Sequence, residues 1–492
     1  MSSRTAQAAR WGGALLLLAL SWAIFFHRLG ARSLLGDESA HAEAAREAAI
    51  SGHWWPLEAF GGVYVEKPPL TIWATAAVFR VFGVSERNDR ILDALLGVAT
   101  VLLVYACGCA MFGARAALAA GLLLLSTHYF IFLHGVRDGV PDAAVVFLVS
   151  GALLLYFLTR QKDRAPAGFW PTIACGFQTG LVILSKNAVG WFVVLILGAF
   201  EAIRAFPKRP SAPSLKRIAV IGLFALAFQA AWFFAVSRAT GGGAGHFFYR
   251  DVWERFTVGL DPGHRIPGLY RFILKVDFGK GLLVLPAAVF FAFRDHRFGN
   301  RERAEAVLFL FIWAAAILLV MESSISKLPW YIYPAYPAIV LLLGFAIDRV
   351  AAAIGRRSRA VSAAFLAFVV FFIGMHVRRA WNTAERDVKQ TGVARLAEWL
   401  SAPGRPALCR EPGLHMREWE EYYLRPLARE PQRRAFACGL LLTRNPAAYL
   451  TPQEIPLQSH KFHAYSPLDL PLYVVDTRRD LPAALFGPAA RP

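Results

Sequence analysis

Long apolar segments alternate with short polar segments over the first three-quarters of the chain. A run of about twenty apolar residues is long enough to cross the hydrocarbon core of a bilayer as a helix. By that rule the pattern predicts an all-α polytopic membrane protein with about eleven transmembrane helices. The predicted spans lie near residues 11–28, 89–112, 115–133, 140–160, 169–186, 188–204, 217–237, 270–293, 304–321, 330–348 and 360–378.

The longest polar interruption in this region, residues 29–88, follows the first predicted span. Within it, residues 37–50 have a helical composition and end at a Ser-Gly pair, which predicts an amphipathic helix lying on the membrane surface. The run 69–83 is short for a span and begins with two prolines, which favours a half-buried or interfacial helix. The loop therefore leaves the membrane after the first span and returns to it near Pro68.

The distribution of charge predicts the orientation. The chain is 56% hydrophobic and carries a net charge of +19, and its mean hydropathy is +0.43. The short loops 160–164, 204–217, 294–303 and 349–359 are all basic, as expected of cytoplasmic loops. This predicts a cytoplasmic N-terminus and an outside C-terminus. It also accounts for the positive charge without a nucleic-acid partner.

Polar residues from five separate loops are then expected at the outer face. Ionisable groups near a membrane are costly and usually functional, so their gathering on one side indicates a site there. The residues concerned are Asp37, Glu38, Glu66, Lys67, Arg137, Asp138, Asp142, Lys186, Arg255, His264 and Lys327.

The tail, residues 379–492, differs in composition from the membrane module 1–378, being rich in Arg, Pro and Glu. Short apolar runs at 437–443 and 472–477 and a helix-like stretch at 391–402 predict a small extracytoplasmic α/β domain. In an oxidising compartment, Cys409 and Cys438 of this tail are expected to pair.

These residue types suit a reaction on a lipid-borne phosphate. Cations stabilise an anionic leaving group, and the carboxylate of Asp37 is suited to accept a proton from an attacking hydroxyl. Simpler interpretations exist. Asp37 and Glu38 resemble a helix N-terminal acid pair. Lys186 and Lys327 fit snorkelling anchors, and Arg137 is equally suited to pair with a neighbouring aspartate.

Several motifs in order resemble the bacterial branch of the protein mannosyltransferase and lipid A aminoarabinose transferase superfamily, which are integral-membrane glycosyltransferases with the C-type fold. One departure is Asn187, because the superfamily usually has glycine after the lysine of the third motif. The motifs are GDESAHAEAAREAAISGHWW (36–55), GGVYVEKPPLTIW (61–73), GLVILSKNAVGWFVVL (180–195), FFYRDVWERF (247–256) and SISKLPWYIYPAYPAIVLLLG (324–344).

The resemblance implies roles for individual residues. Asp37 matches the acid that binds or deprotonates the acceptor, with Glu38 as its neighbour, and Asp142 matches a second acid. Residues expected to hold the lipid phosphate of the donor are Lys67, Arg255 and Tyr331, with Arg137, Lys186 and Lys327 as further cations.

The resemblance also implies a divalent metal in some members. Glu66 matches a residue associated with that metal, and His246 and His264 are the nearest histidines to the expected ligand position. For both histidines, a loop hydrogen-bonding role is the alternative. No nucleotide-binding loop is visible, so no nucleotide cofactor is expected.

The sequence therefore predicts a glycosyltransferase of the bacterial inner membrane. It is expected to move a sugar from a polyprenyl-phosphate donor to an envelope lipid, glycan or protein at the periplasmic face, with inversion. Lipid A or lipopolysaccharide is the favoured acceptor, and a protein O-mannosyltransferase-like enzyme is the alternative. A lipid-linked-sugar flippase would place ionisable groups mid-membrane and show paired halves, and neither is visible. A non-catalytic scaffold would not need Asp37, Lys67 and Asp142 together.

Overall fold

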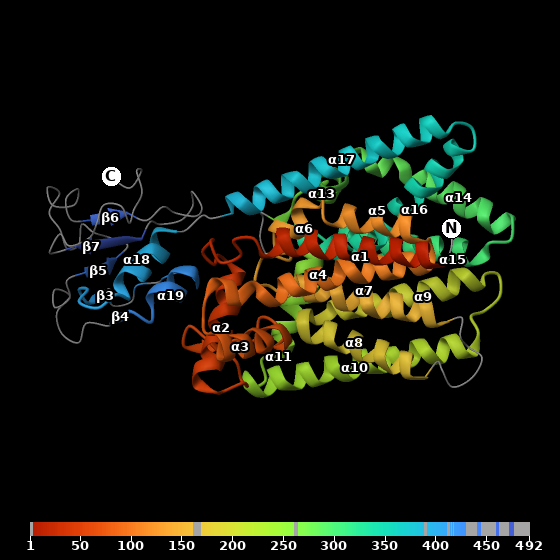
Figure 1. Ribbon diagram of the computed structural model, residues 1–492. Helices are drawn as coiled ribbons and strands as arrows, with labels where there is room; N and C mark the ends of the chain where they lie inside the picture. Colours follow the sequence, from red (N-terminus) through yellow and green to blue (C-terminus); the bar gives the residue numbers. More distant parts are fainter. Residues whose placement is uncertain are drawn as a thin grey trace.

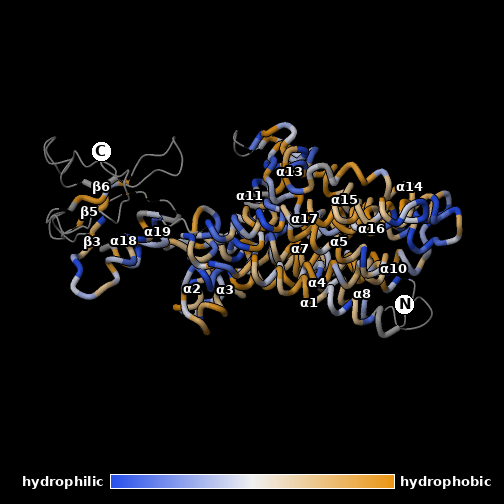
Figure 2. Tube along the Cα trace, turned by 45° about the horizontal axis from the view of Figure 1, so that its top comes forward, coloured by the Kyte–Doolittle hydropathy of each residue, from blue (hydrophilic) through white to orange (hydrophobic). Residues whose placement is uncertain are grey.

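The computed structural model describes residues 3–160, 169–259, 264–387, 391–410, 414, 416, 418–429, 440–443, 459–461 and 472–476. It is an elongated bundle of helices with a small α/β domain at one end (Figure 1). Hydrophobic residues dominate the middle of the bundle, and hydrophilic residues gather toward its two ends (Figure 2). This distribution is typical of a protein that spans a bilayer.

The bundle is built from long apolar helices that follow the predicted spans. In the described part of the chain, eight are long and apolar enough to cross a membrane, or nine if one bent pair is counted as a span. The helices are α1 Ser3–Phe26, α4 Glu86–Met111, α5 Ala114–Leu124, α7 Asp142–Thr159, α8 Phe169–Lys186, α9 Trp191–Ala205, α10 Ala212–Ala239, α13 Leu269–Phe278, α14 Leu285–Arg297, α15 Arg301–Ser323, α16 Tyr336–Gly355 and α17 Arg359–Arg386.

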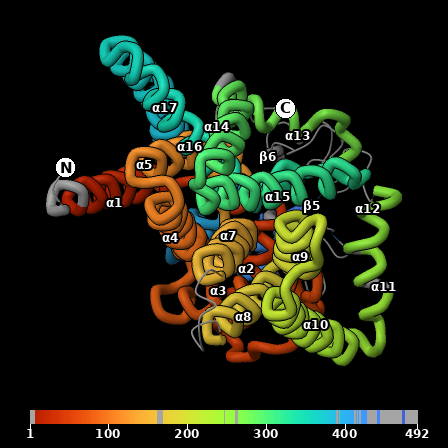
Figure 3. Tube along the Cα trace, turned by 90° about the vertical axis from the view of Figure 1, so that its right-hand side faces the viewer, coloured from red at the N-terminus to blue at the C-terminus, as the bar shows by residue number. Residues whose placement is uncertain are grey.

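Two predicted spans differ from the structure. The span predicted at 115–133 is the short helix α5, followed by a break and the single-turn helix α6 His128–Phe132. The span predicted at 270–293 is α13 and α14, which meet at 88°. The two spans predicted around Lys186 are present as α8 and α9, which Figure 3 shows as separate coils seen end-on.

The packing of the bundle rests on close helix approach. On α16, a Cβ added to Gly344 would lie 2.3 Å from the carbonyl oxygen of Ala116 on α5, so only glycine fits there. Bulky apolar side chains fill the rest, among them the buried Trp313 and Phe309 of α15.

The loop after α1 carries the first half of the site. It contains α2 Asp37–Ser51, a small hairpin of β1 Glu58–Ala59 and β2 Gly62–Val63, and α3 Leu70–Phe82. The predicted helix in this loop is present as α2, but the expectation that it lies on the membrane surface as an amphipathic helix is wrong. Nine of its 15 residues are buried, because α3 and the C-terminal domain cover it.

The C-terminal domain has a small sheet with strand order β4-β3-β5-β7-β6. β3 pairs in parallel with β4 and β5, whereas β7 is antiparallel to β5 and β6. The elements are α18 Gly392–Leu400, β3 Leu408–Arg410, α19 Glu418–Leu424, β4 Ala428–Arg429, β5 Leu440–Thr443, β6 Ser459–Lys461 and β7 Tyr473–Asp476. They include the helix and both strands expected from the sequence.

The structure adds two details to what the sequence predicts for the tail. Helix α17 continues to Arg386, past the expected boundary at residue 378. Cys409 is disulfide-bonded, and its expected partner, Cys438, lies outside the described residues.

The C-terminal domain docks on the loop that carries α2. The hydroxyl of Tyr423 in α19 donates to Glu86 at 2.9 Å and accepts from the backbone N–H of Leu34 at 2.9 Å. Arg46 of α2 donates to the carbonyl of Tyr422 at 2.8 Å. The domain and the start of α1 lie at opposite ends of the bundle (Figure 1).

Candidate active site

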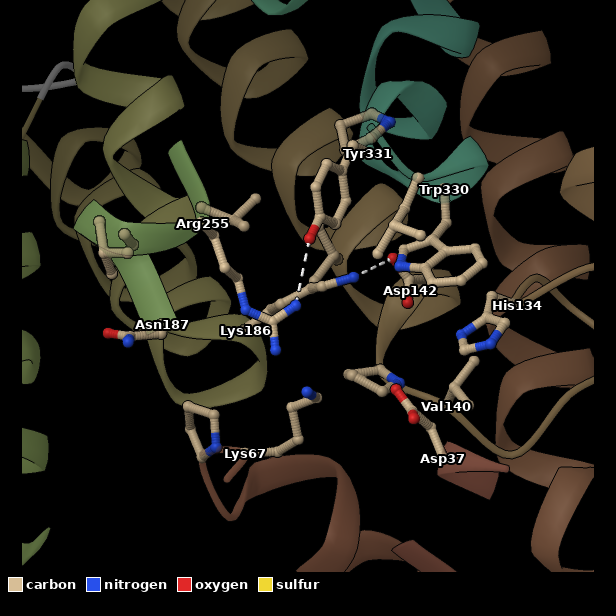
Figure 4. A pocket seen from close by; sticks show the side chains of 18 of the residues that line it. Asp37, Lys67, His134, Val140, Asp142, Lys186, Asn187, Arg255, Trp330 and Tyr331 are labelled. Carbon is tan, nitrogen blue, oxygen red and sulfur yellow. Dashed lines mark hydrogen bonds and ion pairs between the residues drawn. The ribbon is translucent and has the colours of Figure 1, made fainter. Parts of the chain in front are cut away.

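A cavity of about 200 Å³ lies at the end of the bundle that faces the C-terminal domain. It is walled by the loop after α1, the start of α7, the α8–α9 turn, and segments around residues 255 and 330. Its charged and hydrogen-bonding side chains are Asp37, His41, Glu66, Lys67, His134, Asp142, Lys186, Arg255 and Tyr331. Seven of the predicted site residues are therefore brought together (Figure 4).

Asp37 opens α2 and lies on one side of the cavity (Figure 4). Gly36 before it has φ 55°, a left-handed conformation that glycine adopts without strain. Burial acts to raise the pKa of the Asp37 carboxyl, but nearby positive charges, chiefly that of Lys67, outweigh it and hold the pKa below its usual value. Asp37 is therefore a carboxylate at neutral pH.

Lys67 and Arg255 extend into the cavity from two other walls (Figure 4). Arg255 follows a π-helical turn, Tyr249–Glu254, and its guanidinium donates to the hydroxyl of Tyr331 at 3.4 Å. No ion pair joins Lys67 to a carboxylate among the described residues. Its ammonium is thus available to an anion.

Asp142 and Lys186 form an ion pair inside the cavity. Asp142 lies in the first turn of α7, where the helix dipole favours a carboxylate. Lys186 ends α8, and its ammonium donates to Asp142 at 2.5 Å. Asn187 then takes φ 46°, a conformation that asparagine tolerates better than most residues, and accepts a hydrogen bond from Gln229. Asparagine thus allows the left-handed turn between α8 and α9.

Glu38, predicted beside Asp37 as a catalytic acid, lies outside the cavity lining. Successive helical residues point about 100° apart, so its side chain turns into the protein while Asp37 faces the cavity. It accepts from Arg90 at 2.6 and 2.9 Å and from the backbone N–H of Gly139 at 2.9 Å. Burial acts to raise the pKa of Glu38, but the Arg90 and Arg32 guanidiniums hold it well below its usual range.

Arg137 and Lys327 do not reach the cavity either, contrary to the prediction. The guanidinium of Arg137 donates to the carbonyls of Ile24, Phe25 and His27 at the end of α1. The ammonium of Lys327 donates to two carbonyls at the end of α15. Both cations are used for satisfying backbone acceptors that helix ends leave unpaired.

The predicted metal ligands do not assemble. Glu66 lines the cavity, whereas His264 is absent from its lining, and only the backbone of His246 is described, in α11 Ala244–Phe248. Within the described ranges, no group of three or more His, Cys, Asp or Glu side chains is placed to hold a metal ion. The described donors therefore do not fit a metal ion.

The cavity residues that were not predicted include His41, His134 and Trp330. His41 follows Asp37 by four residues and so lies on the same helix face, a spacing that was available in the sequence. Burial lowers the pKa of His41 to about 4, so its imidazole is neutral at neutral pH. His134 and Trp330 stack on each other, and no sequence pattern joins residues so far apart.

The comparisons with known proteins agree with this arrangement. Residues 66–233 match the family model described as dolichyl-phosphate-mannose-protein mannosyltransferase. The chain is 26% identical over 351 residues to undecaprenyl phosphate-alpha-4-amino-4-deoxy-L-arabinose arabinosyl transferase 1 of Pseudomonas fluorescens, covering 70% of this chain and 61% of that protein. The corresponding transferase 2 of Proteus mirabilis is 26% identical over 344 residues, covering 68% of this chain and 60% of that protein.

The fold agrees as well. The crystal structure of ArnT from Cupriavidus metallidurans bound to undecaprenyl phosphate superposes with a TM-score of 0.67 at 22% identity, covering 97% of this chain and 99% of that chain. The chain is similar in sequence to protein mannosyltransferases and aminoarabinose transferases, and it shares the fold of the ArnT structure.

The fold is also similar to that of a more distant solved structure. An oligosaccharyltransferase from Archaeoglobus fulgidus matches with a TM-score of 0.56 at 14% identity, over 96% of this chain and 75% of that chain. The chain spans about three-fifths of the length of the curated relatives it matches. The predicted resemblance and fold class are thus confirmed, and the protein is an integral membrane protein.

Proposed function

We propose that the protein is a glycosyltransferase that moves a sugar from a polyprenyl-phosphate donor to an envelope acceptor. The observation that carries the proposal is the separation of charge in the cavity. Lys67 and Arg255, with the hydroxyl of Tyr331, surround one part of it, and the Asp37 carboxylate lies apart from them (Figure 4). An anionic leaving group and a proton acceptor are thereby placed on opposite sides of one small space.

The reaction needs no covalent enzyme intermediate. The phosphate of the donor lies against Lys67, Arg255 and Tyr331, which offset the charge that develops as the bond from the anomeric carbon to the phosphate oxygen breaks. The acceptor hydroxyl attacks that carbon from the other face and transfers its proton to Asp37. Displacement in a single step inverts the configuration.

The paired residues Asp142 and Lys186 fill a different role. Because Lys186 already neutralises Asp142, the pair adds no net charge to the cavity. Its buried, polar surface offers hydrogen bonds to sugar hydroxyls without competing with Asp37 for the proton.

The names of the relatives support a lipid-linked donor. Two of them are undecaprenyl-phosphate sugar transferases, and the ArnT structure contains undecaprenyl phosphate. We extend that donor class to this chain. The acceptor is an envelope lipid or glycan in this proposal, with a protein acceptor as the alternative that the mannosyltransferase family suggests.

The location follows from the basic loops. Loops 204–217, 294–303 and 349–359 lie at the end of the bundle opposite the cavity. Positively charged short loops stay in the cytoplasm, which supports a periplasmic location for the cavity and the C-terminal domain, at a bacterial inner membrane.

Removal of the Arg255 guanidinium should weaken donor binding. We expect Arg255→Leu to lower the affinity for undecaprenyl phosphate by about ten- to a hundredfold, since a hydrogen bond to a charged group contributes about 1.5–3 kcal/mol. Binding is measured on the purified full-length protein in nanodiscs. Arg250→Leu, an exposed arginine in the same segment, is the matched control. Equal affinities of wild type and Arg255→Leu would contradict the phosphate site.

The Lys67 charge should also set the acid limit of activity. Lys67 is the largest of the charges that lower the pKa of Asp37, so Lys67→Met should raise that pKa. A base is active only above its pKa, and the acid limb of the kcat/KM profile should therefore move to higher pH. Lys208→Met, in a loop at the far end of the bundle, should leave the limb in place. An unmoved limb in Lys67→Met would contradict the coupling.

A further inference from the structure

An aromatic pair forms part of the cavity wall beside the acids. The imidazole of His134 and the indole of Trp330 stack with ring centroids 3.6 Å apart and planes 10° from parallel. Both side chains are half-buried and line the cavity, near Asp37 and Asp142 in Figure 4. The stack presents a flat ring surface beside the charged groups of the cavity.

The two rings come from segments that are tied together. Trp330 lies in a 3-10 turn, Pro329–Ala335, which also contains the fully buried Tyr333. The hydroxyl of Tyr333 lies 2.9 Å from the carbonyl oxygen of Tyr129 and 2.7 Å from that of Leu133, next to His134. These hydrogen bonds therefore hold the two rings in place before any ligand binds.

The loop that carries His134 is itself under conformational constraint. His134 has φ 49°, a left-handed conformation that costs a non-glycine residue about 1 kcal/mol or more. Backbone hydrogen bonds from Val136 to Phe130 and from Arg137 to Ile131 close the loop. The guanidinium of Arg137 fixes it to the end of α1. This structural role explains why Arg137 is buried although it does not reach the phosphate site.

The position of the stack relative to the phosphate site identifies its ligand. Trp330 directly precedes Tyr331, whose hydroxyl contacts Arg255. On the other side, His134 lies near Asp37 in the cavity wall (Figure 4). A group bonded directly to a phosphate at Arg255 and Tyr331 would thus lie over the His134–Trp330 stack, with its reactive carbon facing the Asp37 side.

We propose that the His134–Trp330 stack is the binding platform for the donor sugar and selects a pyranose with an unbroken C–H face. This inference rests on the proposed function, because the sugar is placed by its phosphate. A pyranose whose hydroxyls are equatorial presents such an apolar face to a flat ring system, as aromatic side chains prefer for apolar partners. An axial hydroxyl directed at the rings would lose its hydrogen bonds and be disfavoured.

The test compares two probes on the purified full-length protein in nanodiscs, undecaprenyl phosphate and undecaprenyl phosphate β-glucose. The platform should make wild type bind the glucose-bearing lipid more tightly than the sugar-free lipid. Trp330→Ala should lower the affinity for the glucose-bearing lipid by about tenfold and leave that for undecaprenyl phosphate unchanged. Trp330→Phe, which keeps a planar ring, should lower the affinity for the glucose-bearing lipid by less. Trp170→Ala, an exposed tryptophan at the start of α8, is the control and should change neither affinity.

The outcomes separate the two claims. Equal loss for both probes in Trp330→Ala, or no loss for either, would overturn the platform while leaving the phosphate site and the proposed function intact. Equal affinities of the wild type for the two probes would also overturn the platform and leave the phosphate site intact. If wild type bound neither probe, the proposed function would fail, and the platform with it.

Discussion

Asp37→Asn should reduce sugar transfer by at least about a hundredfold, and as much as ten-thousandfold, while leaving the protein folded, since a general base contributes 10²–10⁴-fold. The amide keeps the shape of the side chain but accepts no proton at neutral pH. Asp37 is the cavity carboxylate best suited to this role, because Asp142 is already paired with Lys186. Turnover is measured from the release of undecaprenyl phosphate at saturating donor.

Two comparisons make this result specific to the proton transfer. Glu47→Gln, on the same helix but absent from the cavity lining, should keep full activity. Asp37→Asn should still bind undecaprenyl phosphate, because Lys67, Arg255 and Tyr331 are untouched. Full turnover by Asp37→Asn would remove Asp37 from the catalytic role.

The second large effect is on stability. Glu38→Gln should lower the free energy of unfolding by about 3–5 kcal/mol, because it leaves the charge of a buried arginine without its partner. Arg90 is 1% exposed and also donates to the carbonyls of Leu29 and Arg32, so it has no route to solvent. The measurement is the midpoint of thermal unfolding, with the exposed Glu302→Gln as the control.

A double-mutant cycle shows that the loss comes from this pair. Arg90→Met should cost less in the Glu38→Gln background than in wild type. The pKa of Glu38 is lowered in the folded state, so the stabilisation is present above its unfolded pKa of about 4.3 and is lost as pH falls through the folded value. An unchanged unfolding midpoint in Glu38→Gln would contradict this account of the residue.

Periodicity and length predicted the membrane architecture well where helices are long. They were less informative where a helix is short or interrupted, as in α5 and at the bend between α13 and α14. A twenty-residue window averages over such breaks. The burial of α2 was also missed, because its cover comes from α19, nearly four hundred residues later in the chain.

The candidate site was also predicted in part. Asp37, Lys67, Asp142, Arg255 and Tyr331 were all predicted and all line one cavity. Neighbouring Glu38 was misassigned, because a list of charged residues does not show which way a side chain points on a helix. Arg137 and Lys327 were misassigned because unpaired backbone carbonyls compete with a ligand for cations.

Sugar transfer by the purified protein tests the central claim most directly. Wild-type protein is reconstituted in liposomes with sugar-loaded undecaprenyl phosphate and an extract of envelope lipids and glycans as the acceptor pool, and the products are followed by mass spectrometry. The account predicts that undecaprenyl phosphate and a glycosylated acceptor appear in equal amounts, and that neither appears with Asp37→Asn. Intact sugar-lipid that merely crosses the bilayer, with no undecaprenyl phosphate released, would contradict the account and indicate a transporter.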